Sequence, residues 1–567
     1  MNTNNMITGS EILIRSLMAE GTDTIFGYPG GAVIPIFDKL YDYTEQIQHI
    51  LVRHEQGAAH AAEGYARVSG KTGVVLVTSG PGATNIVTGV ADAMIDSTPI
   101  VVITGQIASS LIGTDAFQEV DIVGITQPIT KWSCQIRRPQ DIAKAVAKAF
   151  YIASTGRPGP VVLDITKDAQ MGKAEFHYEQ CKFIRSYNPI PTPDESSLSE
   201  AVKLIDNAKK PLLLIGQGVT ISHAEDILSQ FIEKADIPAA WTLLGASALP
   251  TGHRLNKGML GMHGNVGPNM KTNECDLLIA VGMRFDDRVT GDLKTYAKQA
   301  KVIHIDIDPS EIHKNVKADV AIITDARLAL TELFSRIKEN NHTDWIDSFN
   351  IHEQEEFNRV IRDEIHPLDG ELNMGEVVNF ISEATNHSAV LVTDVGQNQM
   401  ISSRYFKYKQ GRSIITSGGL GTMGFGLPAA IGAKLGAPER TVCLFTGDGG
   451  IQMNIQELGT IMQYGIAPKI IILNNEYLGM VRQWQELFFD KRYSHTPMFN
   501  PDYAKIAEAY SIDSRVVSHR SDLEDAVKEM LKYPEKPFIL QVNVKQQGMV
   551  YPMVAAGTTI TNILMGD

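Results

Sequence analysis

The stretch TGDGGIQMNIQELGTIMQYGIAPKIIILNNEYLGM, residues 446–480, decides the fold of this chain. It predicts a strand at Thr441–Thr446, a Gly-Asp-Gly turn, a helix, and a second apolar strand at Lys469–Leu473. Asp448 follows the first strand and Asn475 follows the second, 475 − 448 = 27 positions later, about one strand-helix-strand unit. Ligands bind at the carboxyl edge of open parallel sheets, so we expect both side chains at one ligand-binding edge.

The residue types at this edge indicate a cation that holds a diphosphate. A carboxylate and an amide oxygen suit a hard cation such as Mg²⁺. Gly449 and Gly450 let the backbone approach a ligand closely, and the helix behind them offers free N–H groups to an anion. A tight turn of any α/β protein is the alternative, but the Asn-Asn pair at this spacing resembles the thiamine diphosphate signature.

Short apolar runs alternate with helical stretches in the first and last thirds of the chain, which predicts an α/β fold of doubly wound parallel sheets. Similar spacing in both thirds suggests an internal structural duplication. Helices are expected at Gln56–Val68 and Ala83–Met94, and Thr8-Gly-Ser-Glu11 fits a capping box. The predicted strands are Thr24–Phe26, Ile50–Val52, Val74–Val77, Ile100–Ile103, Val390–Thr393, Ile414–Thr416, Val442–Phe445 and Ile470–Leu473.

The middle of the chain predicts a third sheet, with strands at Leu212–Ile215, Leu277–Val281 and Val302–Ile305. Gly216-Gln-Gly218 follows the first of these strands, and Asp306 lies near the end of the last. The two features together favour nucleotide binding, although the glycines alone also fit a structural turn. The predicted domains are 1–187, 196–340 and 371–567, with 341–370 as a polar, helical, solvated connector.

Composition narrows the class of protein. The 567 residues have length for three or four domains, and the net charge of −14 argues against a nucleic-acid or anionic-membrane surface. Glu11 and Arg15 interrupt the first apolar run, so no signal peptide is expected, and no run is long enough to span a membrane. The cysteines are widely spaced, which indicates a reducing, cytoplasmic location: Cys134, Cys181, Cys275 and Cys443.

Beyond these patterns, nearly the whole chain resembles the thiamine-diphosphate enzymes, and within them the catalytic (large) subunits of acetohydroxyacid synthase, or acetolactate synthase. The Arg284–Gly291 match points to the flavin-containing biosynthetic branch. The other matching segments are Phe26–Ala32, Arg53–Ala58, Thr78–Asn85, Gly113–Glu119, Gly261–Gly264, Gly418–Gly424 and the opening stretch.

The resemblance implies roles for two residues in the chemistry of the cofactor. Glu55 matches the acid that pairs with the aminopyrimidine, although a carboxylate at a helix start also serves as a cap. Met423 matches the residue that supports the bent cofactor, although a methionine in such a turn is usually core. Asn398 stands where the family commonly has histidine, and its amide can still donate to phosphate.

The same resemblance assigns the remaining contacts of the first domain and the last domain, which would bind the aminopyrimidine and the diphosphate respectively. Gln118 and Gly31 are expected beside the reacting centre. The predicted metal ligands are Asp448, Asn475 and Tyr477. The predicted diphosphate and cofactor contacts are Val395, Gly396, Gln397, Asn398, Gly421, Met423, Gly449, Gly450, Leu478, Gly479 and Met480.

For the central domain the resemblance implies FAD in a structural role, because the overall reaction transfers no net electrons. The predicted FAD contacts are Arg157, Gly216, Gly218, Thr242, Leu243, Met262, His263, Gly282, Arg284, Asp306 and Asp325.

Substrate choice is assigned to three further residues. Trp484 matches the residue that favours 2-ketobutyrate as second substrate, although a tryptophan on an amphipathic helix is often core. Arg288 matches an arginine that holds the acceptor carboxylate, and the alternative is an ion pair with Asp286 or Asp287. Lys167 matches a residue at the entrance, or is simply a solvated lysine.

The function implied by the resemblance is decarboxylation of pyruvate and ligation of its two-carbon unit to a second 2-ketoacid, in valine, leucine and isoleucine biosynthesis. Implied partners are a second copy, in a homodimer or homotetramer, and a small regulatory subunit. Three alternatives remain open: a pyruvate oxidase-like flavin enzyme, a nucleotide-binding regulatory protein without catalysis, and a flavin-free fermentative synthase.

Overall fold

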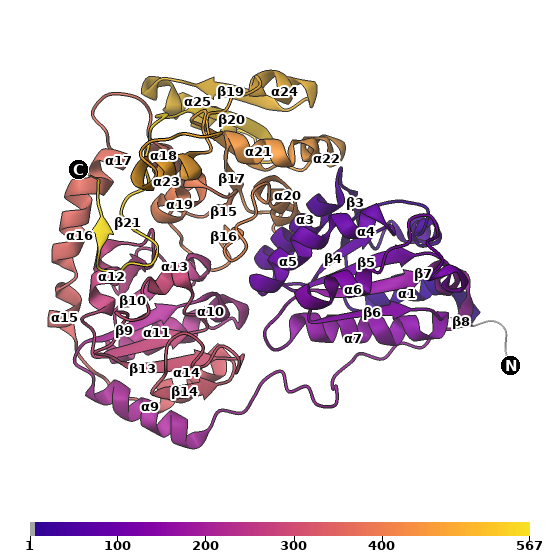
Figure 1. The fold of residues 1–567 in the computed structure, drawn as a ribbon, viewed down its shortest axis with the longest axis horizontal. Helices are drawn as coiled ribbons and strands as arrows, with labels where there is room; N and C mark the ends of the chain where they lie inside the picture. The colour runs from indigo at the N-terminus through magenta and orange to yellow at the C-terminus, as the bar shows by residue number, and fades with distance from the viewer. Residues whose placement is uncertain (1–5, 567) are drawn as a thin grey trace.

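The computed structural model describes residues 6–566, and within that range it forms three six-stranded parallel sheets (Figure 1). Each sheet has buried residues on both faces, packed against helices, as expected for doubly wound α/β domains. None of the helices in residues 6–566 combines the length and the apolar character needed to cross a membrane.

The sheet of the N-terminal domain has the order β3-β2-β4-β5-β7-β6. Helices α1 (Gly9–Ala19) and α7 (Ile142–Ser154) cover one face, and α3 (Glu55–Ser69) and α5 (Val87–Ile95) cover the other. As the sequence predicts, Thr8 caps α1 by accepting a hydrogen bond from the Glu11 N–H. The strands are β2 (Thr24–Tyr28), β3 (Gln48–Leu51), β4 (Gly73–Val77), β5 (Ile100–Gln106), β6 (Trp132–Ile136) and β7 (Val161–Thr166).

One predicted helix of this domain differs from the structure. Instead of a continuous helix at Ala83–Met94, the chain forms α4 (Pro81–Asn85) and α5, which meet at Ile86. The first of these helices begins at Pro81, directly after Gly80, whose φ of 59° only glycine adopts easily. The division matters for the site because α4 ends at Asn85, which contacts Glu55.

The sheet of the C-terminal domain repeats the connectivity of the first. Its order is β16-β15-β17-β18-β20-β19, so both sheets read 2-1-3-4-6-5 when strands are numbered within each domain. This agreement supports the internal structural duplication that the spacing of strands suggests. The strands are β15 (Val390–Thr393), β16 (Ile414–Ile415), β17 (Val442–Gly447), β18 (Lys469–Asn474), β19 (Asp513–Val517) and β20 (Phe538–Asn543).

The central sheet has a different order, β11-β10-β9-β12-β13-β14, which reads 3-2-1-4-5-6 in the numbering of its own domain. This is the strand order of dinucleotide-binding folds, in which ligands bind where the order reverses, here between β9 and β12. The strands are β9 (Pro211–Ile215), β10 (Ala239–Trp241), β11 (Asn256–Met259), β12 (Leu277–Val281), β13 (Lys301–Asp306) and β14 (Val320–Ile323).

The connector at 341–370 is helical, as predicted, and it is solvated on one face, while its other face is buried. Its helices α15 (Thr343–Asp347), α16 (Asn350–Glu356) and α17 (Arg362–Ile365) run along one side of the molecule (Figure 1). Trp345 and Phe349 are buried in the core of the central domain. The buried Glu356 carboxylate pairs with Arg404 of the C-terminal domain. The connector is polar on one face only, because its other face packs on both domains.

The N-terminal and C-terminal domains meet through α3 and α20 (Gly426–Gly436), which lie side by side (Figure 1). A Cβ on Gly432 would lie 1.7 Å from the Ala61 carbonyl oxygen, and one on Gly64 would lie 2.1 Å from that of Ala429. The two backbones therefore touch without side chains between them. This close packing fixes the start of α3, which carries Glu55, relative to the C-terminal domain.

Candidate functional site

The predicted metal ligands lie together at the carboxyl edge of the C-terminal sheet. Asp448 opens α21 (Asp448–Met453) after β17, and Asn475 follows β18, the neighbouring strand. The Asp448 Oδ2 accepts a hydrogen bond of 2.6 Å from Asn500, and the Asn475 Oδ1 accepts one of 3.2 Å from the Tyr477 N–H. Burial raises the pKa of the Asp448 carboxyl to about 6. A buried carboxylate beside a buried amide oxygen fits a divalent cation.

The turn at Val395–Asn398 reaches the same edge from β15. The Gln397 Oε1 accepts a hydrogen bond of 3.2 Å from the Asn475 amide, and a Cβ on Gly479 would lie 2.2 Å from the same oxygen. The diphosphate and metal segments predicted from the sequence are therefore in direct contact.

Asn398 is the residue of this turn that fits an absent anion best. Its side chain is buried, and neither its amide nitrogen nor its amide oxygen has a hydrogen-bond partner among the described residues. A Cβ built on Gly447 would lie 3.8 Å from its amide nitrogen, and one built on Gly396 would lie 3.7 Å from its amide oxygen, so the amide lies beside these two glycines. A buried amide without a partner costs free energy, and a phosphate oxygen would satisfy its N–H groups.

Met423 belongs to residues 417–424, which we call the glycine loop, between β16 and α20. The Met423 methyl group lies 3.8 Å from a Cβ built on Gly449, in the same space as Leu478 and Met498. Gly421 has a φ of 70°, and Gly424 one of 85°, so the loop needs glycine at both positions. The predicted cofactor contacts of the C-terminal domain thus surround one region.

Glu55 is the first residue of α3, and its half-buried side chain faces the carboxyl edge of the N-terminal sheet. Its Oε2 accepts a hydrogen bond of 2.9 Å from Asn85, and its Oε1 lies 3.4 Å from a Cβ built on Gly82. The N-terminal cap is His54, whose Nδ1 accepts from the Gln56 N–H. The alternative reading of Glu55 as the cap is therefore wrong.

Gln118 lies against the turn that opens α4, since a Cβ on Gly80 would lie 2.9 Å from that of Gln118. Its φ of 62° is uncommon for a residue other than glycine and often marks functional sites. Gly31 lies after β2, with nothing within 4 Å of a Cβ built on it. Gly30, beside it, packs on Thr78, the residue that follows β4. Glu55, Gln118 and Gly31 therefore come from loops at one edge of this sheet.

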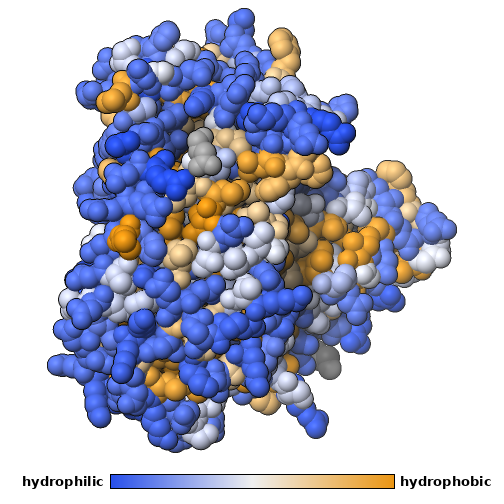
Figure 2. Space-filling view, turned by 60° about the vertical axis from the view of Figure 1, so that its left-hand side comes forward, coloured by the Kyte–Doolittle hydropathy of each residue, from blue (hydrophilic) through white to orange (hydrophobic). Residues whose placement is uncertain are grey.

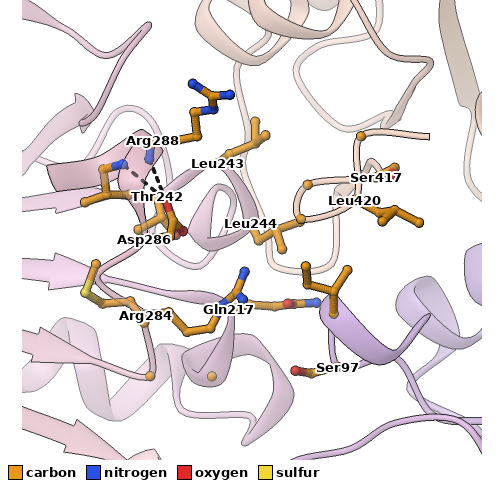
Figure 3. Close-up of a pocket in the computed structure, with 18 of the residues that line it drawn as sticks. Ser97, Gln217, Thr242, Leu243, Leu244, Arg284, Asp286, Arg288, Ser417 and Leu420 are labelled. Carbon is orange, nitrogen blue, oxygen red and sulfur yellow. Dashed lines mark hydrogen bonds between the residues drawn. The ribbon is translucent and has the colours of Figure 1, made fainter. Parts of the chain in front are cut away.

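A cavity of about 780 Å³ lies where the three domains meet, and Figure 3 shows part of its wall. Arg157 comes from the N-terminal domain, and its guanidinium pairs with Asp308 and Glu311 of the central domain. Burial lowers the pKa of His263 to about 3, so this imidazole is neutral, and its Nδ1 has no partner among the described residues. The predicted FAD contacts that line the cavity are Arg157, Gly218, Thr242, Leu243, Met262, His263, Gly282, Arg284, Asp306 and Asp325.

Gly216 is the one predicted FAD contact that is not among the lining residues. A Cβ on it would lie 2.1 Å from the Gly282 carbonyl oxygen, so this glycine lets the turns after β9 and β12 pack together. For Gly216 the structural turn is the better interpretation.

The cavity extends to the C-terminal domain, and its lining includes two of the predicted substrate residues, Trp484 of the C-terminal domain and Arg288 of the central domain. Trp484, on α23 (Gly479–Phe488), is half-buried and lines the cavity together with Met423 and Met480. Arg288 lines it too, with a side chain that is 60% exposed. Its nearest carboxylate, Asp287, is 3.8 Å away, and an exposed pair at this distance contributes little.

Asp286 does not pair with Arg288. Instead it caps α13 (Asp287–Thr290) by accepting from the N–H groups of Arg288 and Val289 (Figure 3). The Arg288 guanidinium is therefore available to an anionic group. Lys167 is exposed at the start of α8 (Lys167–Met171) and is not among the cavity-lining residues.

Three residues of the site carried no assigned role in the sequence analysis. Asn85 ends the Thr78–Asn85 segment, and the resemblance of that segment to the family could have identified this residue as part of the site. Asp394 precedes Val395 and accepts hydrogen bonds from the N–H groups of Val395, Gly424 and Gly426, which ties the 395–398 turn to the glycine loop. Asn500 contacts Asp448 from 52 positions away, and no spacing rule identifies such a contact.

Comparison with known proteins agrees with this architecture. Models of known families match in three segments: the thiamine pyrophosphate enzyme N-terminal TPP binding domain at 7–125, the central domain at 198–333 and the C-terminal TPP binding domain at 394–542.

Curated relatives match over nearly the full length. The acetolactate synthase large subunit of Lactococcus lactis is 44% identical, over 97% of this chain and 95% of its own length. That of Haemophilus influenzae is 43% identical, over 99% and 98%. The probable acetolactate synthase large subunit of Methanocaldococcus jannaschii is 44% identical, over 98% and 95%. This chain therefore belongs to the thiamine pyrophosphate enzyme family, in the branch of the acetolactate synthase large subunits.

Proposed function

We propose that this chain decarboxylates pyruvate and ligates the two-carbon unit to a second 2-ketoacid, pyruvate or 2-ketobutyrate, as a step of branched-chain amino-acid biosynthesis. The products are 2-acetolactate and 2-aceto-2-hydroxybutyrate. The observation that carries the proposal is the full-length similarity to acetolactate synthase large subunits, together with the clustering of the predicted cofactor residues.

The residues at the edge of the C-terminal sheet fit thiamine diphosphate and Mg²⁺. Asp448, Asn475 and Tyr477 would hold the cation, and the buried Asn398 amide would donate to the diphosphate. Bound thiamine diphosphate supplies an electron sink for the carbon that loses CO₂. Glu55 holds or releases a proton at its carboxylate, Met423 limits the space in which the cofactor lies, and Trp484 and Arg288 orient the second ketoacid.

The proposal includes FAD in the central domain. It is supported by the 3-2-1-4-5-6 strand order and by a cavity lined by ten of the eleven predicted contacts. Asp306, at the end of β13, lines this cavity, and its carboxylate would accept hydrogen bonds from ribose hydroxyls there. The chemistry proposed here needs no redox step from the flavin, so its role would be structural.

The proposed active assembly is at least a homodimer. Glu55 hydrogen-bonds Asn85 of its own domain, and Glu55, Gln118 and Gly31 are not among the described residues that line the cavity. Large apolar side chains are exposed in the single chain beside two residues of the site: Phe117 (87%) precedes Gln118, and Phe499 (102%) precedes Asn500. Figure 2 shows apolar surface at the middle of one face and on the lobe that projects to the right. Such surface is typical of an interface.

We also propose a small regulatory subunit as a partner, since the curated relatives are named large subunits.

The test is a product assay with pyruvate, alone and with 2-ketobutyrate, in the presence and absence of thiamine diphosphate, Mg²⁺ and FAD. Acetolactate that forms only with thiamine diphosphate and Mg²⁺ would support the proposal. Failure to form acetolactate under any of these conditions would refute it. Stoichiometric bleaching of flavin absorbance by pyruvate without oxygen would instead support the oxidase.

A further inference from the structure

The glycine loop, which carries Met423, is held by the N-terminal domain of its own chain. The Ser417 hydroxyl donates a 2.7 Å hydrogen bond to the Asp92 Oδ1 and accepts a 2.9 Å bond from the Thr422 N–H. Asp92 lies on α5, and both its side chain and Ser417 are buried. The hydroxyl thus closes the loop on itself and ties it to the other domain.

Asp96, one turn further along, binds the loop backbone with both carboxylate oxygens. Its Oδ2 accepts from the Gly418 N–H at 2.8 Å and its Oδ1 accepts from the Gly419 N–H at 2.7 Å. The Arg67 guanidinium lies 2.8 Å from the Asp96 Oδ2 and also donates to the Thr416 carbonyl. The carboxylate is 1% exposed, so these bonds lie away from competing water.

The opposite side of the loop packs on the central domain. A Cβ on Gly418 would lie 2.7 Å from the side chain of Leu244 in the central domain, whereas one on Gly419 would lie 2.7 Å from the Asp96 Oδ1 on the side of the N-terminal domain. Figure 3 shows Leu244, from the central domain, beside the loop segment that carries Ser417 and Leu420. The loop therefore has room for glycine only at these two positions, and its glycines leave the backbone little stiffness of its own.

We propose that Asp96, assisted by Asp92 through Ser417, is a positioning residue that holds the glycine loop, and with it Met423, in the conformation that binds the cofactor. This inference rests on the proposed function, because it assigns Met423 to thiamine diphosphate. A glycine-rich loop without these anchors samples many conformations, and only a fraction of them is competent to bind, which weakens the apparent affinity.

The first test measures the loop without any cofactor. Hydrogen–deuterium exchange of the cofactor-free protein, read on peptides that cover 414–425, is expected to be faster in Asp96→Asn and in Ser417→Ala than in the natural protein. The asparagine keeps the shape of the side chain but places an amide N–H₂ against a backbone N–H. Ser417→Ala removes only one hydroxyl group, and it is the variant to measure if Asp96→Asn does not fold.

A matched control is Asp236→Asn in the central domain. Asp236 is also buried, and its oxygens accept from Arg254 and from the His342 N–H, but it has no contact with the glycine loop. It should leave exchange at 414–425 unchanged. Equal acceleration in this control and in Asp96→Asn would show a general loss of stability and overturn the proposal.

The second test measures the affinity for thiamine diphosphate with Mg²⁺ by calorimetry. We expect binding about tenfold weaker in Asp96→Asn, and non-additive losses when it is combined with Met423→Ala, because both changes act on one loop. Natural-like affinity in Asp96→Asn and Ser417→Ala, or additive losses, would refute the positioning role. Failure of the natural protein itself to bind would refute the proposed function instead.

Discussion

At the scale of single residues, the site contains two kinds of buried polar side chain. Some have all their hydrogen-bond partners within the protein, and others have none. Asp394 accepts three backbone hydrogen bonds, which shape two turns, so its carboxylate is fully hydrogen-bonded within the chain. Asn398 is equally buried, yet its amide has no partner in residues 6–566. Buried polar groups without partners cost free energy, and the position of Asn398 among the predicted diphosphate contacts indicates that a ligand satisfies its amide.

The role of Glu55 leads to the first prediction. Glu55→Gln keeps the side-chain shape and a group that can accept from Asn85, but removes the ability to exchange a proton at pH 7. We expect kcat for acetolactate formation to fall by about 10²-fold or more, with the thermal midpoint unchanged. Steady-state assays and differential scanning fluorimetry measure the two quantities, and unchanged turnover would contradict the role.

Asn398 gives a second prediction, on cofactor affinity. Asn398→Ala removes the unpartnered amide, so the affinity for thiamine diphosphate should fall about tenfold while the protein becomes no less stable. Asn398→His, which supplies an N–H donor, should recover most of the affinity. Calorimetric titration with Mg²⁺ present checks both, and equal affinities in all three proteins would show that the amide does not face the diphosphate.

At the scale of elements, the contact between α3 and α20 depends on the absence of side chains. Gly432→Ala would place a methyl group 1.7 Å from the Ala61 carbonyl oxygen, so the helices must move apart. We predict a loss of about 3 kcal/mol or more in stability, seen as a lower thermal midpoint. Gly252→Ala is the control, because nothing lies within 4 Å of its new methyl group. Equal midpoints for the two variants would contradict the close packing.

Helices α3 and α5 bury an excess of acidic groups between them, which predicts a pH dependence. Glu63 on α3 and Asp92 on α5 share their surroundings with Asp96, His60 and the single guanidinium of Arg67. Burial, with the neighbouring carboxylates, raises the pKa of Asp92 to about 8 and that of Glu63 well above its usual value. Both groups therefore keep protons in the folded chain that the unfolded chain releases near pH 4.

Because unfolding releases these protons, stability should fall as the pH rises from about 4 to about 8, by up to ~1.4 kcal/mol per pH unit for each proton. The thermal midpoint of the cofactor-free protein should lose this contribution over the range, while His60, whose pKa burial lowers to about 4, contributes in the opposite direction below about pH 6.5. Glu63→Gln, which resembles the protonated acid, should flatten the decrease, and Glu200→Gln, on the exposed face of α9 (Glu195–Asn207), should not. A pH dependence that Glu63→Gln leaves unchanged would contradict the charge assignment.

At the scale of the whole molecule, the sequence predicts the sheets well, and long-range contacts poorly. The apolar strand runs are confirmed because a strand buried on both faces, such as β4 or β12, must be apolar throughout. The buried face of the connector is missed because Trp345 and Phe349 stand in a mostly polar segment, and only the packing of the domains shows that they are buried. In the sequence, Asp96 is likewise an ordinary acidic residue at the end of a helix. Only the structure shows that it accepts hydrogen bonds from the glycine loop of the C-terminal domain.

The N-terminal and C-terminal domains share one architecture, and this explains how the proposed cofactor site can take residues from both of them. Two sheets of the same connectivity each present loops at their carboxyl edges, one with Glu55 and one with Asp448. In a symmetric dimer, an interface that joins the first edge of one copy to the second edge of the other occurs twice. Two sites would form, each with residues from both copies.

Hybrid dimers test this arrangement. Glu55→Gln and Asp448→Ala should each be inactive alone, since every site lacks one essential group. In a hybrid of the two, one site combines both changes and the other has natural residues at both positions. Random mixing makes about half of the dimers hybrid, so co-expression should recover about a quarter of the natural activity. If Glu55 and Asp448 act within one chain, no site is complete in any dimer, and the mixture should stay as inactive as its parents.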